Sequence, residues 1–260
     1  GAHRMTDLAV VDTGVPDGVP IVWLGSLGSS TAMWERQVAV FGATHRCVLI
    51  DHPGHGASPP TSGSLSIAGL GADVVAALDR ADVTTAHVVG LSLGAMVAMW
   101  LSTEHPGRVD RLTLMCTTAH FDDPDPWHER AATVRAGGTS GVADTIVSRW
   151  LTPEYAAQHP DEVAAFVAMI SATDGESYAG CCDAIAAMDQ RPVLSEIAAP
   201  TLVIGGRLDP ATPPIYQETI AAGVPSSRLE VLEAAHFANW EVADDVNRLL
   251  AAHLDGSNDG

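Results

Sequence analysis

The stretch "VVGLSLGAMVAMW", residues 88–100, runs from an apolar segment through a short polar turn into a second apolar segment. The first segment has the composition of a buried strand, and the last has helical spacing. Between them, Gly90-Leu91-Ser92-Leu93-Gly94 matches the pattern G-x-S-x-G. Such a strand-to-helix turn is so sharp that its flanking positions must lack side chains, and it exposes the serine hydroxyl above the sheet. The alternative is a serine that only caps a helix; the flanking strand and helix favour a nucleophile.

Apolar runs of strand length recur along the chain and alternate with stretches of helical period. The strand-like runs are residues 19–24, 47–50, 87–91, 112–116, 202–204 and 229–232, and helical stretches include residues 67–78, 95–101 and 215–222. Continuous apolar strands that alternate with helices predict an α/β fold with a mostly parallel central sheet covered on both faces. Residues 6–12 are expected to add an antiparallel edge strand.

The alternation breaks after residue 116 and resumes in "APTLVIGG", which begins at residue 199. The segment between carries helical patterns without a convincing buried strand. We therefore predict a core formed by residues 5–119 and 196–260, with a helical lid of residues 120–195 inserted above the sheet. Residues 1–4, ahead of Met5, are interpreted as a remnant of expression and are excluded from the fold.

The balance of charge limits the possible partners. The chain carries 13 basic and 32 acidic residues, a formal charge of −19, which repels nucleic acids and anionic membranes and excludes both as partners. No apolar run approaches the roughly 18 uncharged residues of a membrane span. Four cysteines give no disulfide framework at this size, and Cys181 and Cys182 are adjacent, so a cytoplasmic location is expected. The sequence leaves the oligomeric state open.

A serine nucleophile needs a base, and the base needs a carboxylate that orients it. In proteins with this turn the three follow in the chain order serine, acid, histidine. Asp209, in "GGRLDP", and His236, in "EAAHFANW", each follow a predicted strand, at the edge where ligand sites form in open α/β sheets. Asp122 and Asp123, after the preceding strand, are rivals for the acid, and Asp209 can also cap the helix that follows it.

Acyl transfer also needs two backbone N–H groups that stabilise the developing oxyanion. The N–H of Leu93, directly after the nucleophile, is the first expected donor. The N–H of Ser26 is the second, because "GSLG" provides small residues and an open backbone after the first predicted strand. His52 and His55, in the loop "DHPGHG", are expected to hold loops in place and to take no part in the chemistry.

Together these residues resemble the α/β-hydrolases, and more narrowly the 3-oxoadipate enol-lactonases. The segments that carry the resemblance are "VVGLSLGAMVAMWLSTEHPGRVDRLTLMCTTA", "CCDAIAAMDQR" and "APTLVIGGRLDPATPP". The turn and the final strands are specific only to the superfamily, whereas the cysteine pair with "DAIAAMD" is more selective. Three positions depart from the pattern: Ala95 replaces a second glycine, Leu24-Gly25 replaces the His-Gly of many esterases, and Arg207 stands where a small or acidic residue is common.

The resemblance implies hydrolysis of 3-oxoadipate enol-lactone, a five-membered enol ester with a carboxymethyl arm, in the protocatechuate and catechol branches of aromatic catabolism. Ser92 would attack the lactone carbonyl while His236 accepts its proton and Asp209 orients His236. No metal, nucleotide or redox cofactor is needed. A general carboxylesterase or a cofactor-free perhydrolase with a different lid is one alternative. A non-catalytic binding receptor on the same fold is an alternative from another class.

An anionic lactone must enter a protein of charge −19, so a local positive site is expected. A guanidinium can hold a carboxylate with two parallel hydrogen bonds. The lid carries Arg130, Arg135, Arg149 and Arg191. Arg135 and Arg149 are the preferred candidates, with Trp150 beside Arg149, because both lie in apolar-periodic helical stretches expected to face the sheet. The alternative is that each arginine pairs with a surface acid.

Overall fold

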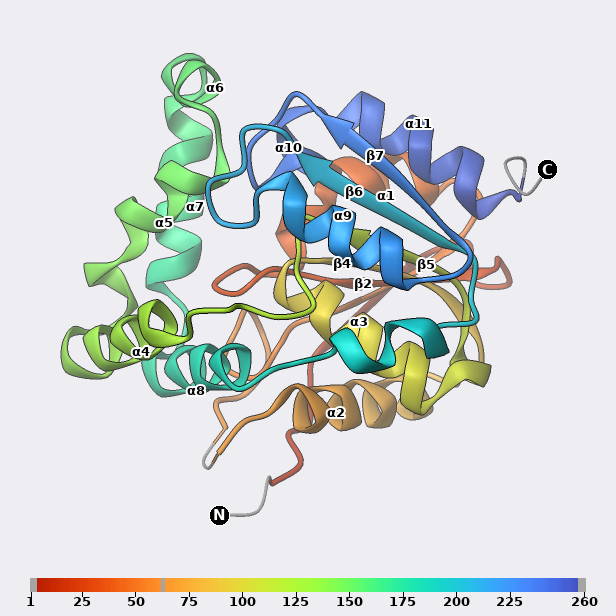
Figure 1. The fold of residues 1–260 in the computed structure, drawn as a ribbon, viewed down its shortest axis with the longest axis horizontal. Helices are drawn as coiled ribbons and strands as arrows, with labels where there is room; N and C mark the ends of the chain where they lie inside the picture. Colours follow the sequence, from red (N-terminus) through yellow and green to blue (C-terminus); the bar gives the residue numbers. More distant parts are fainter. Residues whose placement is uncertain (1–3, 62–63, 257–260) are drawn as a thin grey trace.

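In the computed structural model, which describes residues 4–61 and 64–256, seven strands form one sheet in the order β1-β3-β2-β4-β5-β6-β7 (Figure 1). The strands are β1 (Val10–Gly14), β2 (Pro20–Leu24), β3 (Arg46–Ile50), β4 (Ala86–Leu91), β5 (Val109–Met115), β6 (Thr201–Gly206) and β7 (Ser227–Leu232). The first residues of the expected N-terminal remnant, 1–3, and the end of the expected core, 257–260, lie outside the described residues.

Every neighbouring pair of strands is parallel except β1 with β3. The predicted mostly parallel sheet with an antiparallel edge strand is therefore confirmed. The edge strand begins later than expected, because the chain before it is held by side chains outside the sheet. The N–H of Thr6 donates to Asp73 Oδ1 at 3.0 Å, and that of Ala9 donates to Ser58 Oγ at 2.8 Å.

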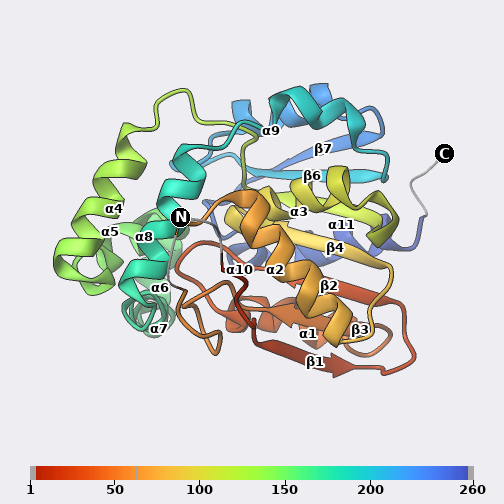
Figure 2. The same ribbon diagram turned by 90° about the horizontal axis from the view of Figure 1, so that it is seen from below.

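Helices cover both faces of the sheet. Those of the core are α1 (Glu35–Phe41), α2 (Ile67–Arg80), α3 (Leu93–Glu104), α9 (Pro214–Gly223), α10 (Ala238–Glu241) and α11 (Ala243–Leu254), with short 3-10 turns η1 (Thr31–Trp34) and η2 (Pro106–Arg108). The helices α2 and α3 pack together on one face, and α1 and α11 pack on the other (Figures 1 and 2). All six residues of the central strand β4 are buried, which explains its continuous apolar sequence. None of the helices in the described ranges is long and apolar enough to cross a membrane.

Between β5 and β6 the chain forms a helical lid. Its elements are α4 (Asp125–Gly137), η3 (Thr139–Gly141), α5 (Ala143–Trp150), α6 (Pro153–Gln158), α7 (Pro160–Ser171) and α8 (Gly175–Ala186), followed by η4 (Arg191–Glu196). These helices gather at the end of the sheet toward which β6 and β7 point (Figure 1). A bridge between His120 and Asp189, together with a 2.8 Å hydrogen bond from Gln190 N to Ala119 O, holds the two ends of the lid side by side.

Candidate active site

Ser92 occupies the turn between β4 and α3, with φ 54° and ψ −115°, a strained conformation for a residue with a side chain. A Cβ atom on Gly94 would lie 2.0 Å from the carbonyl oxygen of Leu24, and one on Gly90 would lie 2.5 Å from the backbone nitrogen of Ala95. Both distances are too short for a carbon atom. The glycines of G-x-S-x-G are therefore required by the close approach of neighbouring backbone.

Hydrogen bonds hold this strained turn in place. The Ser92 N–H donates to the carbonyl oxygen of Met115 at 2.9 Å, and the Gly94 N–H donates to that of Gly25 at 3.0 Å. The hydroxyl of Thr117 donates to the Ser92 carbonyl oxygen at 2.9 Å. The turn is thereby anchored to the end of β5 and to the loop after β2, which fixes where the Ser92 side chain points.

Asp209 and His236 meet beyond the ends of β6 and β7, with Asp209 Oδ2 and His236 Nδ1 2.7 Å apart. Asp209 Oδ2 also accepts from the Thr212 hydroxyl at 2.7 Å, and Oδ1 accepts from the N–H groups of Ala211 and Thr212. Burial alone would raise the pKa of Asp209, but the attraction of His236 and these hydrogen bonds outweigh it and lower that pKa. Arg207 pairs instead with a surface glutamate. Because a carboxylate only accepts hydrogen bonds, His236 Nδ1 carries the proton.

The rival carboxylates have partners other than His236. The side chain of Asp122 is 88% exposed and lies 3.6 Å from Arg191. Asp123 reaches the same cavity as His236, but its carboxylate accepts a hydrogen bond from the Asp125 N–H at the start of α4. Of these three carboxylates, the structure brings Asp209 to the imidazole.

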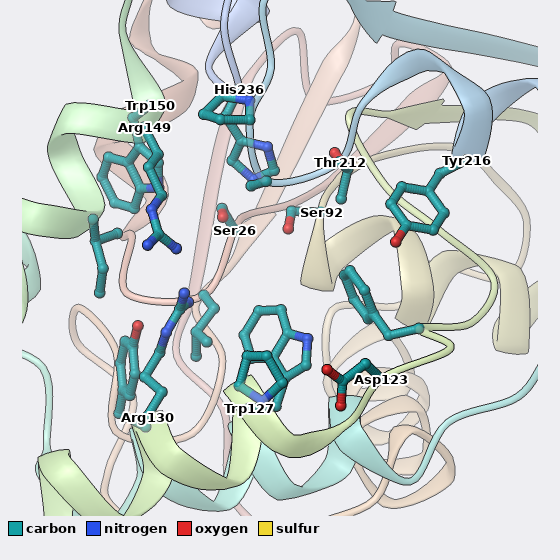
Figure 3. Close-up of a pocket in the computed structure, with 17 residues that line it drawn as sticks. Ser26, Ser92, Asp123, Trp127, Arg130, Arg149, Trp150, Thr212, Tyr216 and His236 are labelled. Carbon is teal, nitrogen blue, oxygen red and sulfur yellow. The ribbon is translucent and has the colours of Figure 1, made fainter.

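A cavity of about 310 Å³ lies between the lid and the end of the sheet (Figure 3). The core contributes polar groups to its wall: Ser26, Ser92, Thr212 and His236. The lid and the loop before it contribute large aromatic and cationic side chains: Phe121, Trp127, Arg130, Arg149, Trp150 and Tyr178. Ser92 and His236 face the same space in Figure 3. A ligand in this cavity would contact both.

The two expected oxyanion donors differ in their surroundings. Leu93 is the first residue of α3, so its N–H has no acceptor within the helix, and no other described residue accepts from it. The Ser26 N–H donates to the sulfur of Met33 at 3.4 Å. A thioether is a weak acceptor, so an anionic oxygen in the cavity would replace it at little cost.

Two buried histidines hold the loop that carries Ser26. His52 Nε2 lies 2.9 Å from the carbonyl oxygen of Gly25. The Gly28 N–H donates to His55 Nε2 at 2.9 Å, and His55 Nδ1 lies 2.8 Å from the Pro53 carbonyl oxygen. Burial lowers the pKa of His52 to about 4 and that of His55 to about 3. Both rings are therefore neutral at pH 7, and His55 must be neutral to accept from Gly28.

We expect His55 to make the stability of the fold depend on pH. Its pKa is lowered from 6.5 to about 3 on folding, so between these values the unfolded chain binds one more proton. Stability is then fully present above pH 6.5 and is lost as the pH falls toward the folded value. At about pH 5 the loss is about 2 kcal/mol for this side chain.

Urea unfolding at about pH 7.5 and about pH 5 tests this expectation. His55→Gln keeps an acceptor for the loop N–H and should reduce the fall in unfolding free energy between the two pH values by about 2 kcal/mol. His128→Gln is the matched control, because the His128 side chain is 56% exposed. An equal fall in His55→Gln and the parent protein would contradict the expectation.

The structure separates the two preferred arginines. Arg149 lines the cavity, but the expectation that Arg135 faces it is wrong. Arg135 pairs with Glu176 at 3.1 Å and Asp183 at 2.7 Å on the outside of the lid. Arg130 lines the cavity instead. Arg130 and Arg135 are five positions apart on α4, which places their side chains about 140° apart around the helix axis.

Arg130 and Arg149 reach the cavity from opposite walls, with their guanidinium groups extended toward each other (Figure 3). No described residue forms an ion pair with either one. The Arg130 guanidinium lies over the ring of Trp127, 4.6 Å from its centroid. The expected neighbour Trp150 also lines the cavity and stacks on Phe237 at 3.9 Å. Two cations that face one space repel each other, and an anion bound between them would offset this repulsion.

The sequence does not indicate a cavity role for four aromatic residues of this wall, of which Phe121 lies in the loop before the lid. Trp127 and Tyr216 lie at its edge, and Tyr178 of α8 is fully buried beside it. The spacing of Trp127 and Arg130, three residues apart on one helix, was a usable signal because such residues share a face. No comparable local signal marks Tyr178.

The cysteine pair does not reach the cavity. Cys181 and Cys182 are both free and buried in α8. Burial raises the pKa of Cys182 to about 12 and raises that of Cys181 further, so both are inert thiols. The buried position of both cysteines in α8 indicates that they pack the interior of the lid. No group of three or more His, Cys, Asp or Glu side chains within the described ranges could hold a metal ion.

Comparison with known proteins gives the family. A family model described as the alpha/beta hydrolase fold matches residues 19–149. The chain is 34% identical over 239 residues to 3-oxoadipate enol-lactonase 2 of Acinetobacter baylyi, an alignment that covers 92% of this chain and 90% of that protein. It is 31% identical over 227 residues to 3-oxoadipate enol-lactonase 1 of the same organism, covering 87% and 85%.

Solved structures show the same similarity. The crystal structure of the enol-lactonase from Burkholderia xenovorans matches with a TM-score of 0.94 at 32% identity, over 96% of this chain and 97% of that one. A hydrolase from Pseudomonas aeruginosa matches with a TM-score of 0.92 at 33% identity, over 96% and 94%. The family model, the sequence relatives and the structures agree. The chain therefore belongs to the α/β-hydrolase family, and it is a hydrolase.

Proposed function

We propose that this hydrolase opens 3-oxoadipate enol-lactone to 3-oxoadipate through an acyl-enzyme on Ser92. The observation that carries the proposal is the 2.7 Å hydrogen bond between Asp209 and His236, beside a strained serine in the same cavity. Such a set supplies a nucleophile, a base and an orienting carboxylate. Similarity to two enol-lactonases over most of the chain supports the choice of substrate.

In the first step, Ser92 Oγ attacks the lactone carbonyl carbon and His236 Nε2 accepts the hydroxyl proton. Asp209 keeps the proton on Nδ1 and stabilises the imidazolium. The carbonyl oxygen becomes an oxyanion that the N–H groups of Leu93 and Ser26 stabilise, with about 3 kcal/mol for each donor. The Ser26 N–H gives up its thioether acceptor for a charged oxygen, which is a stronger hydrogen bond.

Collapse of the tetrahedral intermediate breaks the bond between the carbonyl carbon and the ring oxygen. The ring oxygen takes the proton from His236 and leaves as an enol, which stays attached through the carbon chain and tautomerises to a ketone. A water molecule that gives its proton to His236 then attacks the acyl-enzyme. Collapse of the second tetrahedral intermediate breaks the bond between the carbonyl carbon and Ser92 Oγ, which takes back the proton from His236, and releases the new carboxylate. The enol is a better leaving group than a simple alkoxide.

The carboxymethyl arm of the lactone needs a cationic partner in a protein of charge −19. Arg130 and Arg149 supply two guanidinium groups in the cavity wall. In Figure 3 they lie on one side of Ser92, while Asp123 lies on the other side of Trp127. A ligand with one anionic arm is thereby oriented, with the arm toward the arginines.

A direct assay tests the proposed function. Purified protein is given the enol-lactone and, separately, the neutral ester 4-nitrophenyl butyrate. The proposal expects a specificity constant, kcat/KM, at least about tenfold higher for the lactone. Comparable or better hydrolysis of the neutral ester would favour a general carboxylesterase. Hydrolysis of neither substrate, with no labelling of Ser92 by a fluorophosphonate, would favour a non-catalytic receptor.

The arginines can be tested one at a time. Arg149→Met and Arg130→Met should each lower kcat/KM for the lactone by about 10- to 100-fold, because a charged hydrogen bond contributes about 1.5–3 kcal/mol. The cost should be much smaller for the neutral ester. Arg135→Met is the matched control on the outer face of α4, and it should leave the ratio between the substrates unchanged. If neither cavity variant changes that ratio by more than about threefold, other groups bind the carboxylate.

A further inference from the structure

Tyr178 of α8 is held rigidly at the boundary between the lid and the loop that carries Ser26. Its side chain is 0% exposed, and its ring stacks on the ring of His55, with centroids 6.4 Å apart and planes at 18°. A Cβ atom on Gly28 would lie 3.1 Å from Tyr178 Cε2. Because His55 and Gly28 contact its ring, the position of the Tyr178 hydroxyl is fixed.

The hydroxyl proton of Tyr178 has no acceptor among the described residues, although the Arg130 guanidinium, which can only donate, lies near the hydroxyl oxygen. Several other buried side-chain atoms of the described residues share this property, but Tyr178 is the member of that group whose side chain lines the cavity. A buried polar group without a partner costs free energy, and proteins keep few of them unless the group has a use. The place of Tyr178 in the cavity wall indicates that a ligand supplies the missing partner.

The chemistry around Tyr178 indicates what that ligand is. Burial raises the pKa of Tyr178 well above its ordinary value, against the influence of the nearby Arg130 guanidinium, so the phenol keeps its proton. An arginine offers only donors, so Arg130 cannot accept this proton. A group that accepts from a phenol and a guanidinium at once is an anionic oxygen.

We propose that the Tyr178 hydroxyl donates a hydrogen bond to the free carboxylate of the substrate, beside Arg130, and thereby selects ligands that carry this group. The proposal rests on the proposed function, since it assumes an anionic arm in this cavity. It makes Tyr178 a specificity-determining residue that is left without an acceptor in the free enzyme. Its removal should therefore weaken recognition of the carboxylate without destabilising the fold.

A matched pair of variants tests the proposal. Tyr178→Phe removes the hydroxyl without an acceptor, whereas Tyr155→Phe removes a hydroxyl that donates to Glu162 at 2.8 Å and lies outside the cavity wall. The substrates are mono(4-nitrophenyl) glutarate, which carries one free carboxylate, and neutral 4-nitrophenyl butyrate. They share a leaving group and differ in the charged arm.

Tyr178→Phe should lower kcat/KM for the carboxylated ester relative to the neutral ester by about 10- to 100-fold, with the melting temperature unchanged or raised. Tyr155→Phe should leave the ratio between the esters unchanged and lower the melting temperature by about 2–4 °C. A ratio altered by less than about threefold in Tyr178→Phe would overturn the proposal, and so would an equal loss on both esters. The ratio of kcat/KM between the two esters tests the role of Tyr178 even if the enol-lactone proves not to be the substrate.

Discussion

Ser92→Ala should lower the turnover of the lactone by about a millionfold, the scale observed when a serine nucleophile of this kind is removed. The loss is large because attack, acyl-enzyme formation and the second hydrolytic step all need the same oxygen. The fold should be unaffected, since the Ser92 side chain lines the cavity and alanine meets the same backbone strain at φ 54°. Steady-state kinetics and a melting curve of the purified variant measure both quantities.

Ser102→Ala is the matched control. Ser102 lies on the same helix as the turn, is buried, and donates to the Ala98 carbonyl oxygen at 2.9 Å. Its loss should change turnover little. A fluorophosphonate should label the parent and Ser102→Ala, but not Ser92→Ala. Residual turnover of Ser92→Ala within about tenfold of the parent would show that another group is the nucleophile.

Asp209→Asn should lower turnover by about 10⁴-fold, because it places the proton of His236 on the wrong nitrogen. The N–H groups of Ala211 and Thr212 point at Asp209 Oδ1, so the single oxygen of an asparagine stays there. Its amide NH₂ then faces His236 Nδ1 and donates to it. The imidazole must carry its proton on Nε2, where it can no longer accept the proton of the serine.

Asp122→Asn and Asp123→Asn are the controls, because both side chains are exposed and neither contacts His236. They should stay much closer to the parent activity than Asp209→Asn. Turnover of the three variants, measured side by side at one pH, ranks the carboxylates. A greater loss in Asp122→Asn or Asp123→Asn than in Asp209→Asn would assign the acid to the loop after β5.

The turn at Ser92 could be predicted from the sequence because the residues that shape it are close in the chain. Gly90 and Gly94 flank the serine, and apolar runs on both sides reveal the strand and the helix. Asp209 and His236 follow from a similar local argument, since each comes directly after a strand and parallel strands end at one edge of the sheet. That parallel strands end at one edge of the sheet can be applied without knowledge of side-chain packing.

The lid residues could not be assigned in this way. Arg130 and Arg135 occupy one helix, and which of them faces the cavity depends on how that helix rotates against α8. Acidic partners on α8 hold Arg135 outside. Tyr178 reaches the site through contact with the distant loop glycine Gly28. Contacts between elements far apart in the chain leave no periodic signal in either sequence segment.

The side-by-side ends of the lid have a consequence for how this protein family changes over time. Ala119 and His120 on one side meet Asp189 and Gln190 on the other, so the chain enters and leaves the insertion at one place. An insertion of different length or sequence can be exchanged at that junction while the sheet keeps its connections. Replacement of the lid can then change the range of substrates during evolution. The catalytic residues at the end of the sheet need not change with it.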